Sequence, residues 1–383
     1  MSLCFRLSGE QRLFRETFRK FTEKEIAPLV EEAEEKEEFP RWLFKRMADL
    51  GYLCITYPEE YGGAGADKVT DCILREELAR ISQGFLISWS AHCWLGTYPI
   101  FAFGTEEQKQ QYLIPAIKGE KIAAFGLTEP NAGSDNRALQ TTARPAGSSY
   151  IINGSKIFIT NATFCDYLIV VAYTDKTKGN KGINLFIVDR GTPGFQVARK
   201  LKKEGVRSSE TAELFFDNCQ VSKDKIIGGE QNPATFYELM KILTFGRIGV
   251  AAGCVGIAQA SFEAATRYSQ ERVQFGHPIK DFQAIAFKIA DMATQVEAAR
   301  LLVWQAAWLS DQGEYCVKEA SMAKLFASEV AVRCAKEAMH IFGGYGQMRE
   351  YPVGRYLRDA LVYEIGEGTS EIQRIIISKQ LGL

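Results

Sequence analysis

The run YIINGSKIFITNA, residues 150–162, is rich in β-branched and aromatic side chains, which favour strands over helices. Four runs of the same texture follow it: DYLIVVAYTD (166–175), INLFIVDR (183–190), FQVARKL (195–201) and TAELFFDNCQV (211–221). Asn-Gly, Lys-Gly and Pro-Gly pairs punctuate these runs, as is typical of turns between antiparallel strands. Because no helical pattern interrupts the stretch from about residue 122 to about residue 230, we expect a β domain in the middle of the chain.

Helical patterns precede this β block. Apolar residues between Leu13 and Phe21 recur at three- and four-residue intervals, and Ser8 with Gln11 forms a capping-box pattern that predicts the start of a helix. The acidic run Glu31–Glu38 is interpreted as a solvated helix face. The first 120 or so residues are therefore expected to be helical.

Helical patterns also follow the β block. The run TFYELMKILTFGRIGVAAGCVGIAQASFEAATRYSQERVQF (235–275) keeps the helical period over many turns, and further helices are expected at about 281–312 and 316–342. The order helical, β, helical, in segregated blocks, indicates an α+β fold. We therefore divide the chain into three domains, at residues 1–120, 121–231 and 232–383.

The composition argues against several classes of function. Lys and Arg number 46 against 47 Asp and Glu, so no basic footprint points to nucleic acid or to an anionic membrane surface. Nine scattered cysteines favour free thiols over a disulfide framework, and three distant histidines argue against a His-based metal site. We expect no run to approach the roughly 18 apolar residues of a membrane span, and we identify no targeting segment. We expect a soluble, cytoplasmic protein.

Three stretches carry candidate ligand chemistry. FGLTEPNAGSD (125–135) is rich in turn-forming residues and contains short hydrogen-bond donors such as Thr128 and Ser134. These donors could bind a phosphate or a polar ring edge, but they also fit an ordinary hydrogen-bonded loop. ERVQFG (271–276) sets an Arg near a Phe, as in a pyrophosphate-and-ring site or in a surface pair. HIFGGYGQM (340–348) lacks the surrounding βαβ unit of a dinucleotide site, which leaves a helix C-cap as the alternative.

A fourth stretch, YEIGEGTSEIQR (363–374), sets Glu367 between two glycines just before a helical run. A carboxylate there either stabilises a helix N-terminus by roughly 0.3–1 kcal/mol or serves as a catalytic base on a loop. Glu364 is a weaker candidate for the base. Arg247, inside the long helix, is flanked by small residues that leave room for a ligand.

The motifs GLTEPNAGSD, KIFITNA, ERVQFG, FGGYG and EGTSEIQR, with PEEYGG and TAELFFDN, occur in the order and approximate spacing of the acyl-CoA dehydrogenases. The chain resembles that family over essentially its whole length. The resemblance implies a helical N-terminal domain, a central antiparallel β-barrel and a C-terminal four-helix bundle, with FAD at their junction. It also implies an acyl-CoA substrate, an electron-transfer flavoprotein as electron acceptor, and a homotetramer built as a dimer of dimers, because the family's FAD spans two subunits.

Matched motif by motif, the resemblance gives roles to individual residues. Glu367 would remove the α-proton of an acyl thioester while a hydride leaves Cβ for the flavin, and its own N–H would help to hold the thioester oxygen. The residues expected around the substrate are Ser134, Thr244, Arg247, Gly366 and Gly368. The residues expected around FAD are Phe125, Leu127, Thr128, Ser134, Phe158, Thr160, Arg272, Phe275, Gln283, His340, Gly343, Gly344, Thr369 and Glu371.

The chain departs from the family at informative positions. Some relatives carry the base just before the matched Arg247, but Gly246 stands there and cannot serve. Short-chain members commonly read IYEGT where this chain reads IGEGT, so we predict room for a bulky, branched or cyclic acyl group. Thr244 stands where an Asp often supports the carrier, which keeps open a dehydrogenase or oxidase for carrier-protein thioesters. A flavin oxidase or monooxygenase, and a non-catalytic DNA-binding flavoprotein, are alternatives that the intact EGT and the net charge of −1 oppose.

Overall fold

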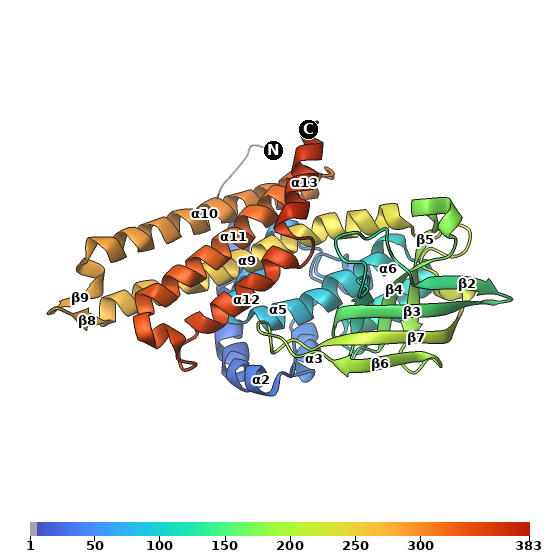
Figure 1. The fold of residues 1–383 in the computed structure, drawn as a ribbon, viewed down its shortest axis with the longest axis horizontal. Helices are drawn as coiled ribbons and strands as arrows, with labels where there is room; N and C mark the ends of the chain where they lie inside the picture. The colour runs from blue at the N-terminus through green and yellow to red at the C-terminus, as the bar shows by residue number, and fades with distance from the viewer. Residues whose placement is uncertain (1–5) are drawn as a thin grey trace.

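The structure is a computed structural model that describes residues 6–383. The long helix α9 (Phe236–Glu271) extends through the centre of the fold. The helix runs from the β-sheet at one end to the β8–β9 hairpin at the other (Figure 1). By length and composition it could cross a membrane, so our expectation that no run approaches such a span is wrong. However, 78% of its apolar window is buried inside the protein, as in a core helix.

The N-terminal part is helical, as predicted. The first helix begins at Ser8, whose side chain accepts from the Gln11 N–H while the Ser8 N–H donates to the Gln11 side chain, so the capping box is confirmed. The acidic run is largely exposed, but Glu37 pairs with Arg207 of the β domain. The helices are α1 (Gly9–Phe21), α2 (Val30–Lys36), α3 (Trp42–Asp49), α4 (Lys68–Ile81), α5 (Gln83–Ser90), α6 (Tyr98–Phe103), α7 (Glu106–Gln108) and α8 (Ile114–Ile117), and π-helical turns lie at η1 (Thr22–Ile26), η4 (Ala91–Gly96) and η5 (Lys109–Leu113).

The middle of the chain forms one curled sheet. The seven strands are β1 (Ala123–Gly126), β2 (Thr142–Ala146), β3 (Ser149–Thr160), β4 (Tyr167–Tyr173), β5 (Ile183–Asp189), β6 (Phe195–Lys200) and β7 (Thr211–Ser222). Their order is β1-β4-β2-β3-β7-β6, with β5 paired to β4. Most pairs are antiparallel, but β1 runs parallel to β4, which the purely antiparallel prediction did not foresee. Alternate residues of β4 enter two cores, one shared with the N-terminal helices and one within the curl.

The pair Asn153–Gly154 is not a turn, contrary to the interpretation from sequence. It lies inside β3, where the pairing with β7 shifts register and forms a bulge. Gly154 has φ +148°, and a Cβ there would lie 2.5 Å from Oγ1 of Thr141, so the close approach of two backbones requires glycine. The turn before β3 is made by Gly147 and Ser148 instead.

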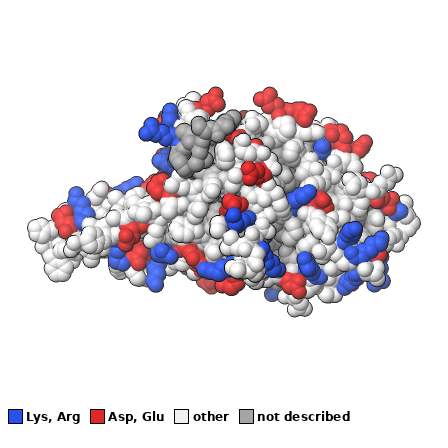
Figure 2. Space-filling model, turned by 90° about the horizontal axis from the view of Figure 1, so that it is seen from above, with Lys and Arg blue, Asp and Glu red and all other residues white. Residues whose placement is uncertain are grey.

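The C-terminal helices pack around α9. The further elements are β8 (Val273–Gln274), β9 (His277–Pro278), α10 (Gln283–Asp311), α11 (Val317–Phe342), α12 (Val353–Ile365) and α13 (Ser370–Gln380). Two of these helices, α10 and α11, match the predicted ranges closely. The fold class, α+β with helical N- and C-terminal parts around a β-sheet, is thus confirmed. On the face seen in Figure 2, positive and negative side chains are interspersed.

His92, in η4, joins three elements in the core. Its Nε2 donates to the Ala116 carbonyl at 3.1 Å, and its Nδ1 accepts from the Ala123 N–H at 3.0 Å, so the neutral ring ties α8 to β1. The ring is 0% exposed, and burial lowers the pKa of His92 to about 4 from the usual 6.5. A protonated His92 would lose its acceptor nitrogen and break the bond to β1.

Stability is expected to fall on mild acidification because of His92. Between roughly pH 6.5 and pH 4 the unfolded chain binds a proton at His92 that the folded chain rejects, so the free energy of unfolding drops by about 1.4 kcal/mol per pH unit. Denaturant unfolding at pH 7, 6 and 5 measures this slope. The slope should shrink in His92→Gln and persist in His277→Gln, which alters an exposed ring. Parallel pH profiles for wild type and His92→Gln would refute the assignment.

Candidate active site

The stretch YEIGEGTSEIQR forms the end of α12, a tight loop and the start of α13. Helix α12 ends at Gly366, whose N–H donates to the Val362 carbonyl at 2.7 Å, and Thr369 caps α13. Between them, Glu367 and Gly368 have φ values of +56° and +90°. Positive φ costs a residue with a side chain on the order of 1–3 kcal/mol, so neighbouring contacts must hold Glu367 in place.

Two side chains hold this loop from neighbouring helices. Lys324 of α11 donates through Nζ to the carbonyl oxygens of Tyr363 and Gly368, at 2.5 and 2.7 Å. Gln373 of α13 donates through Nε2 to the carbonyls of Glu367 and Gly368, at 3.3 and 2.9 Å. A Cβ on Gly368 would lie 2.8 Å from the same Nε2, so a side chain at this position would displace Gln373.

The Glu367 carboxylate lies against α9. Its Oε2 is 3.4 Å from the point where a Cβ on Gly246 would stand, and Nε1 of Trp94 is 3.3 Å from that point. Oε2 is shielded from solvent and accepts no hydrogen bond from residues 6–383. The absence of a side chain at Gly246 therefore gives the carboxylate its place beside the helix.

The surroundings of Glu367 favour a carboxyl group that can take up a proton. Burial raises the pKa of Glu367, and the positive charges of Arg247, Lys324 and Arg75 partly oppose this rise. The Glu367 N–H donates to no acceptor within the described part of the chain. The loop thus offers an unsatisfied carboxylate oxygen and an unsatisfied N–H at the same residue, the two groups that proton abstraction next to a carbonyl requires.

Arg247 is a second incompletely satisfied group near the loop. It is buried, its Nε has no partner among residues 6–383, and its Nη1 makes only a 3.5 Å contact with the Thr244 hydroxyl. Burial lowers the pKa of Arg247, and the charge of Glu367 opposes this. Thr244 donates to the Met240 carbonyl in its own helix and lies 3.4 Å from the Tyr315 hydroxyl. Buried polar atoms without partners are rare in proteins, and a catalytic role, a water or a bound ligand accounts for them.

Aromatic rings line the region next to Gly246. Trp94 stacks on Tyr98 with ring centroids 4.0 Å apart, and Phe245 stands edge-on to both Trp94 and Tyr315. Lys68 lies over the Trp94 ring at 4.7 Å. These rings come from η4, α6, α9 and the loop after α10, so the wall brings together the N- and C-terminal helices.

Gly366 has an ordinary backbone conformation, with φ −69° and ψ +155°. A Cβ there would meet a single heavy atom within 4 Å, the Val362 carbonyl oxygen at 3.2 Å. The backbone therefore does not demand glycine, in contrast to Gly368. What glycine provides at position 366 is open space next to the Glu367 loop.

The residues predicted for the flavin ring come from the end of β1, the loop after it and the end of β3, and these two strand ends meet at one edge of the sheet. Phe125 is in β1, Leu127 and Thr128 follow it, and Thr128 O accepts from the Ile157 N–H of β3 at 2.9 Å. A bulge in β3 gives Phe158 φ +62° and leaves it 66% exposed. Lys156 holds the loop that follows β1 in place: its buried Nζ donates to the Leu127 carbonyl and pairs with Glu129 at 2.8 Å. The sequence reasoning missed this residue.

A second predicted group lies at the opposite end of the molecule. The β8–β9 hairpin holds Phe275, which is 90% exposed. The guanidinium carbon of Arg272 lies 5.4 Å from the ring centroid of Tyr345, which belongs to the turn Gly343–Gln347. This end is separated from the sheet along the long axis (Figure 1). The structure therefore does not bring this group and the flavin-ring group together within one chain. The members of this group are Arg272, Phe275, Gln283, His340, Gly343 and Gly344.

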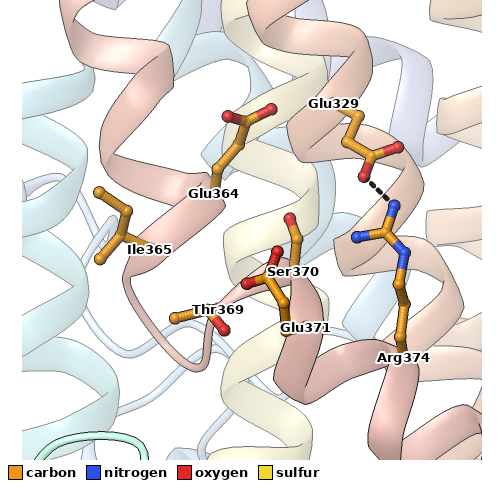
Figure 3. Close-up of a pocket in the computed structure, with 7 residues that line it drawn as sticks. All are labelled: Glu329, Glu364, Ile365, Thr369, Ser370, Glu371 and Arg374. Carbon is orange, nitrogen blue, oxygen red and sulfur yellow. Dashed lines mark hydrogen bonds and ion pairs between the residues drawn. The ribbon is translucent and has the colours of Figure 1, made fainter.

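Thr369 and Glu371 line a pocket of about 330 Å³ between α11, α12 and α13 (Figure 3). Three of its seven lining residues carry carboxylates, and Arg374 pairs with one of them, Glu329. Glu364, the weaker candidate base, faces this pocket. Glu367 is absent from the pocket lining, so the structure separates the two carboxylates that the sequence left as alternatives.

Among known sequences, three models of one family match the chain. They are the acyl-CoA dehydrogenase N-terminal domain at residues 8–120, the middle domain at 124–219 and the C-terminal domain at 236–382. An acyl-CoA dehydrogenase of Bacillus subtilis is 50% identical over 98% of both chains. The 3-(aryl)acrylate reductase of Clostridium sporogenes is 46% identical, over 97% of this chain and 98% of that protein.

Solved structures show the same fold. Butyryl-CoA dehydrogenase from Megasphaera elsdenii superposes with a TM-score of 0.96 at 43% identity and covers 100% of both chains. A chain from a structure described as the electron transferring flavoprotein of Acidaminococcus fermentans superposes with a TM-score of 0.96 at 46% identity, covering 99% of both chains.

Proposed function

The chain belongs to the acyl-CoA dehydrogenase family, and from that premise we propose that it desaturates an acyl-CoA thioester between Cα and Cβ with Glu367 as the base. It is an oxidoreductase, and members of the family are FAD flavoproteins. The observation that carries the proposal is a pair of buried, unsatisfied atoms: Oε2 of Glu367, which lies beside the side-chain-free Gly246, and Nε of Arg247, the next residue of α9.

Each of these groups has a task in the proposed reaction. Oε2 of Glu367 takes the α-proton, and the free Glu367 N–H donates to the thioester oxygen, where negative charge develops. Arg247 binds a polar group of the carrier and stabilises the ionised form of the base. The aromatic wall of Trp94 and Phe245 excludes water, which strengthens each of these electrostatic interactions.

The residues at the sheet edge are suited to a flavin. Phe158 exposes an apolar ring, and the hydroxyls of Thr128, Ser134 and Thr160 make no hydrogen bond within residues 6–383, so all three are free to bind a ligand. FAD, when bound, would accept the hydride that leaves Cβ, while Glu367 takes the proton that leaves Cα, so that one hydride and one proton leave the substrate. Arg272 and the Gly343–Gln347 turn would serve the distant half of the cofactor.

The acyl group is proposed to be bulky, branched or cyclic. The open space beside Gly366 supports this, since nothing but one carbonyl oxygen stands within 4 Å of a Cβ there. The relative named 3-(aryl)acrylate reductase supports a planar ring as one such group, and it also keeps enoyl reduction open as the physiological direction. A butyryl-type substrate is the contrasting case, represented by the Megasphaera structure.

The proposed partners follow from the relatives and from the separated cofactor residues. An electron-transfer flavoprotein is proposed as acceptor, in line with the Acidaminococcus structure. A cytoplasmic homotetramer, a dimer of dimers, would bring the hairpin end of one chain to the sheet edge of another. The second candidate, a dehydrogenase or oxidase for carrier-protein thioesters, is favoured by the Thr244 hydroxyl, which is already bonded within its helix.

Anaerobic bleaching of the bound flavin by a panel of thioesters tests the function. We expect cyclohexanecarbonyl-CoA and 3-phenylpropionyl-CoA to bleach the flavin faster than butyryl-CoA, because the space beside Gly366 admits a ring. The same acyl groups on pantetheine serve as controls for recognition of CoA. A clear preference for butyryl-CoA would contradict the substrate shape, and no bleaching by any thioester would contradict the reaction.

A further inference from the structure

Lys324 is a cation in the buried core of α11. It is 0% exposed, and the neighbouring positions on the same helix face, Ala320, Ala323 and Ala327, are buried alanines. A lysine is rarely buried completely unless its charge is compensated. Here the residues 6–383 offer it no ion pair, and its bonds go to two backbone carbonyls of the Glu367 loop.

The two carbonyls lie on either side of the base. Tyr363 O belongs to the last turn of α12, where carbonyls have no partner within the helix, and Gly368 O follows Glu367 directly. By bonding both, at 2.5 and 2.7 Å, Lys324 spans the loop and fixes its width. This contact opposes relaxation of Glu367 away from its φ of +56°.

Gln373 bonds the same loop as Lys324 and can therefore be compared with it. Its amide bonds the Glu367 and Gly368 carbonyls and thus anchors the same loop without a charge. The ionisable groups that interact with Glu367 or Lys324 come from every packed element: Arg75 of α4, Arg247 and Cys254 of α9, Lys324 of α11, Tyr363 and Glu364 of α12, and Glu371 of α13.

We propose that Lys324 is a positioning residue for the reaction, which holds the carboxylate of Glu367 beside Gly246 and stabilises its negative charge. The inference rests on the proposed role of Glu367 as base. Three positive charges, those of Arg247, Lys324 and Arg75, counter the rise that burial causes in the pKa of Glu367. Of these three, Lys324 alone also bonds the loop itself.

The test compares Lys324→Gln, which keeps amide donors but removes the charge, with Gln373→Met, which removes the neutral anchor and keeps the charge. The pH dependence of flavin bleaching in a single turnover is measured in both holoenzymes. In Lys324→Gln the acid limb of the profile of bleaching rate against pH should move to higher pH, because Glu367 loses a neighbouring positive charge. Bleaching at pH 6 should therefore slow by about tenfold and recover at alkaline pH. In Gln373→Met the loss should be the same at every pH.

Hydrogen exchange gives a readout that does not depend on activity. In the wild-type protein the peptide 362–373 should exchange slowly, and it should exchange faster in Gln373→Met than in Lys324→Gln. Exchange of the wild-type peptide at the rate of an open loop would overturn the proposal even if Lys324→Gln failed to fold. A Lys324→Gln profile whose acid limb stays in place would also overturn it, whereas bleaching that survives in Glu367→Gln would instead overturn the role of Glu367.

Discussion

Replacing Glu367 with Gln is expected to slow flavin bleaching by the preferred thioester by about 10²–10⁴-fold. The amide has the same shape and can still lie beside Gly246, but it cannot take the α-proton. The residues at the sheet edge that we propose to bind FAD are untouched, so the visible spectrum of the bound flavin should not change. Stopped-flow absorbance under anaerobic conditions measures the rate, and the fraction of flavin bound is checked in the same sample.

Glu364→Gln is the matched control for this experiment. Burial raises the pKa of Glu364 as well, so it could act as a base on that criterion alone. Its carboxylate, however, faces the pocket between α11, α12 and α13, which Glu367 does not line (Figure 3). We expect Glu364→Gln to bleach at the wild-type rate. Bleaching that survives in Glu367→Gln and disappears in Glu364→Gln would move the base to the other side of the loop.

Local sequence rules predicted the elements whose stability is local. The Ser8–Gln11 capping box and the ranges of α10 and α11 follow from spacing and caps, and both are confirmed. The pair Asn153–Gly154 was interpreted wrongly as a turn, because β-turns and β-bulges favour the same residue types. What decides between them is the approach of Thr141, which lies in another strand connection and is invisible to a local pattern.

The candidate site divides in the same way. Glu367 and Gly366 stand in one contiguous motif, so sequence was sufficient to select them. Lys324 bonds the loop and Trp94 stands beside Gly246, both from distant parts of the chain, so their relevance depends on how helices pack. A signal for Lys324 did exist, because a lysine at a position in the apolar stripe of α11 conflicts with the helical pattern and calls for a partner. For Trp94 we find no such signal, since a tryptophan in a buried helix is ordinary core.

Replacing Gly366 with Tyr is expected to reverse the substrate preference. The backbone there is extended, so a tyrosine can be accommodated with a shift of a few tenths of an ångström at the Val362 carbonyl. Its phenol ring would then fill the space that we assign to the acyl group. Bleaching by cyclohexanecarbonyl-CoA should slow by about 100-fold relative to bleaching by butyryl-CoA, since even one methylene too many in an apolar pocket costs 10–200-fold.

Gly366→Ala separates the ring from the backbone in this experiment, because it adds the same Cβ next to the Val362 carbonyl and nothing more. If the alanine variant keeps the wild-type preference while the tyrosine variant loses the cyclic substrate, the space beside Gly366 holds the acyl group. If both thioesters slow together in Gly366→Tyr, the ring has disturbed the Glu367 loop instead, and the acyl group must lie elsewhere along the aromatic wall. The ratio of the two rates, and not either rate alone, therefore decides whether position 366 selects the substrate.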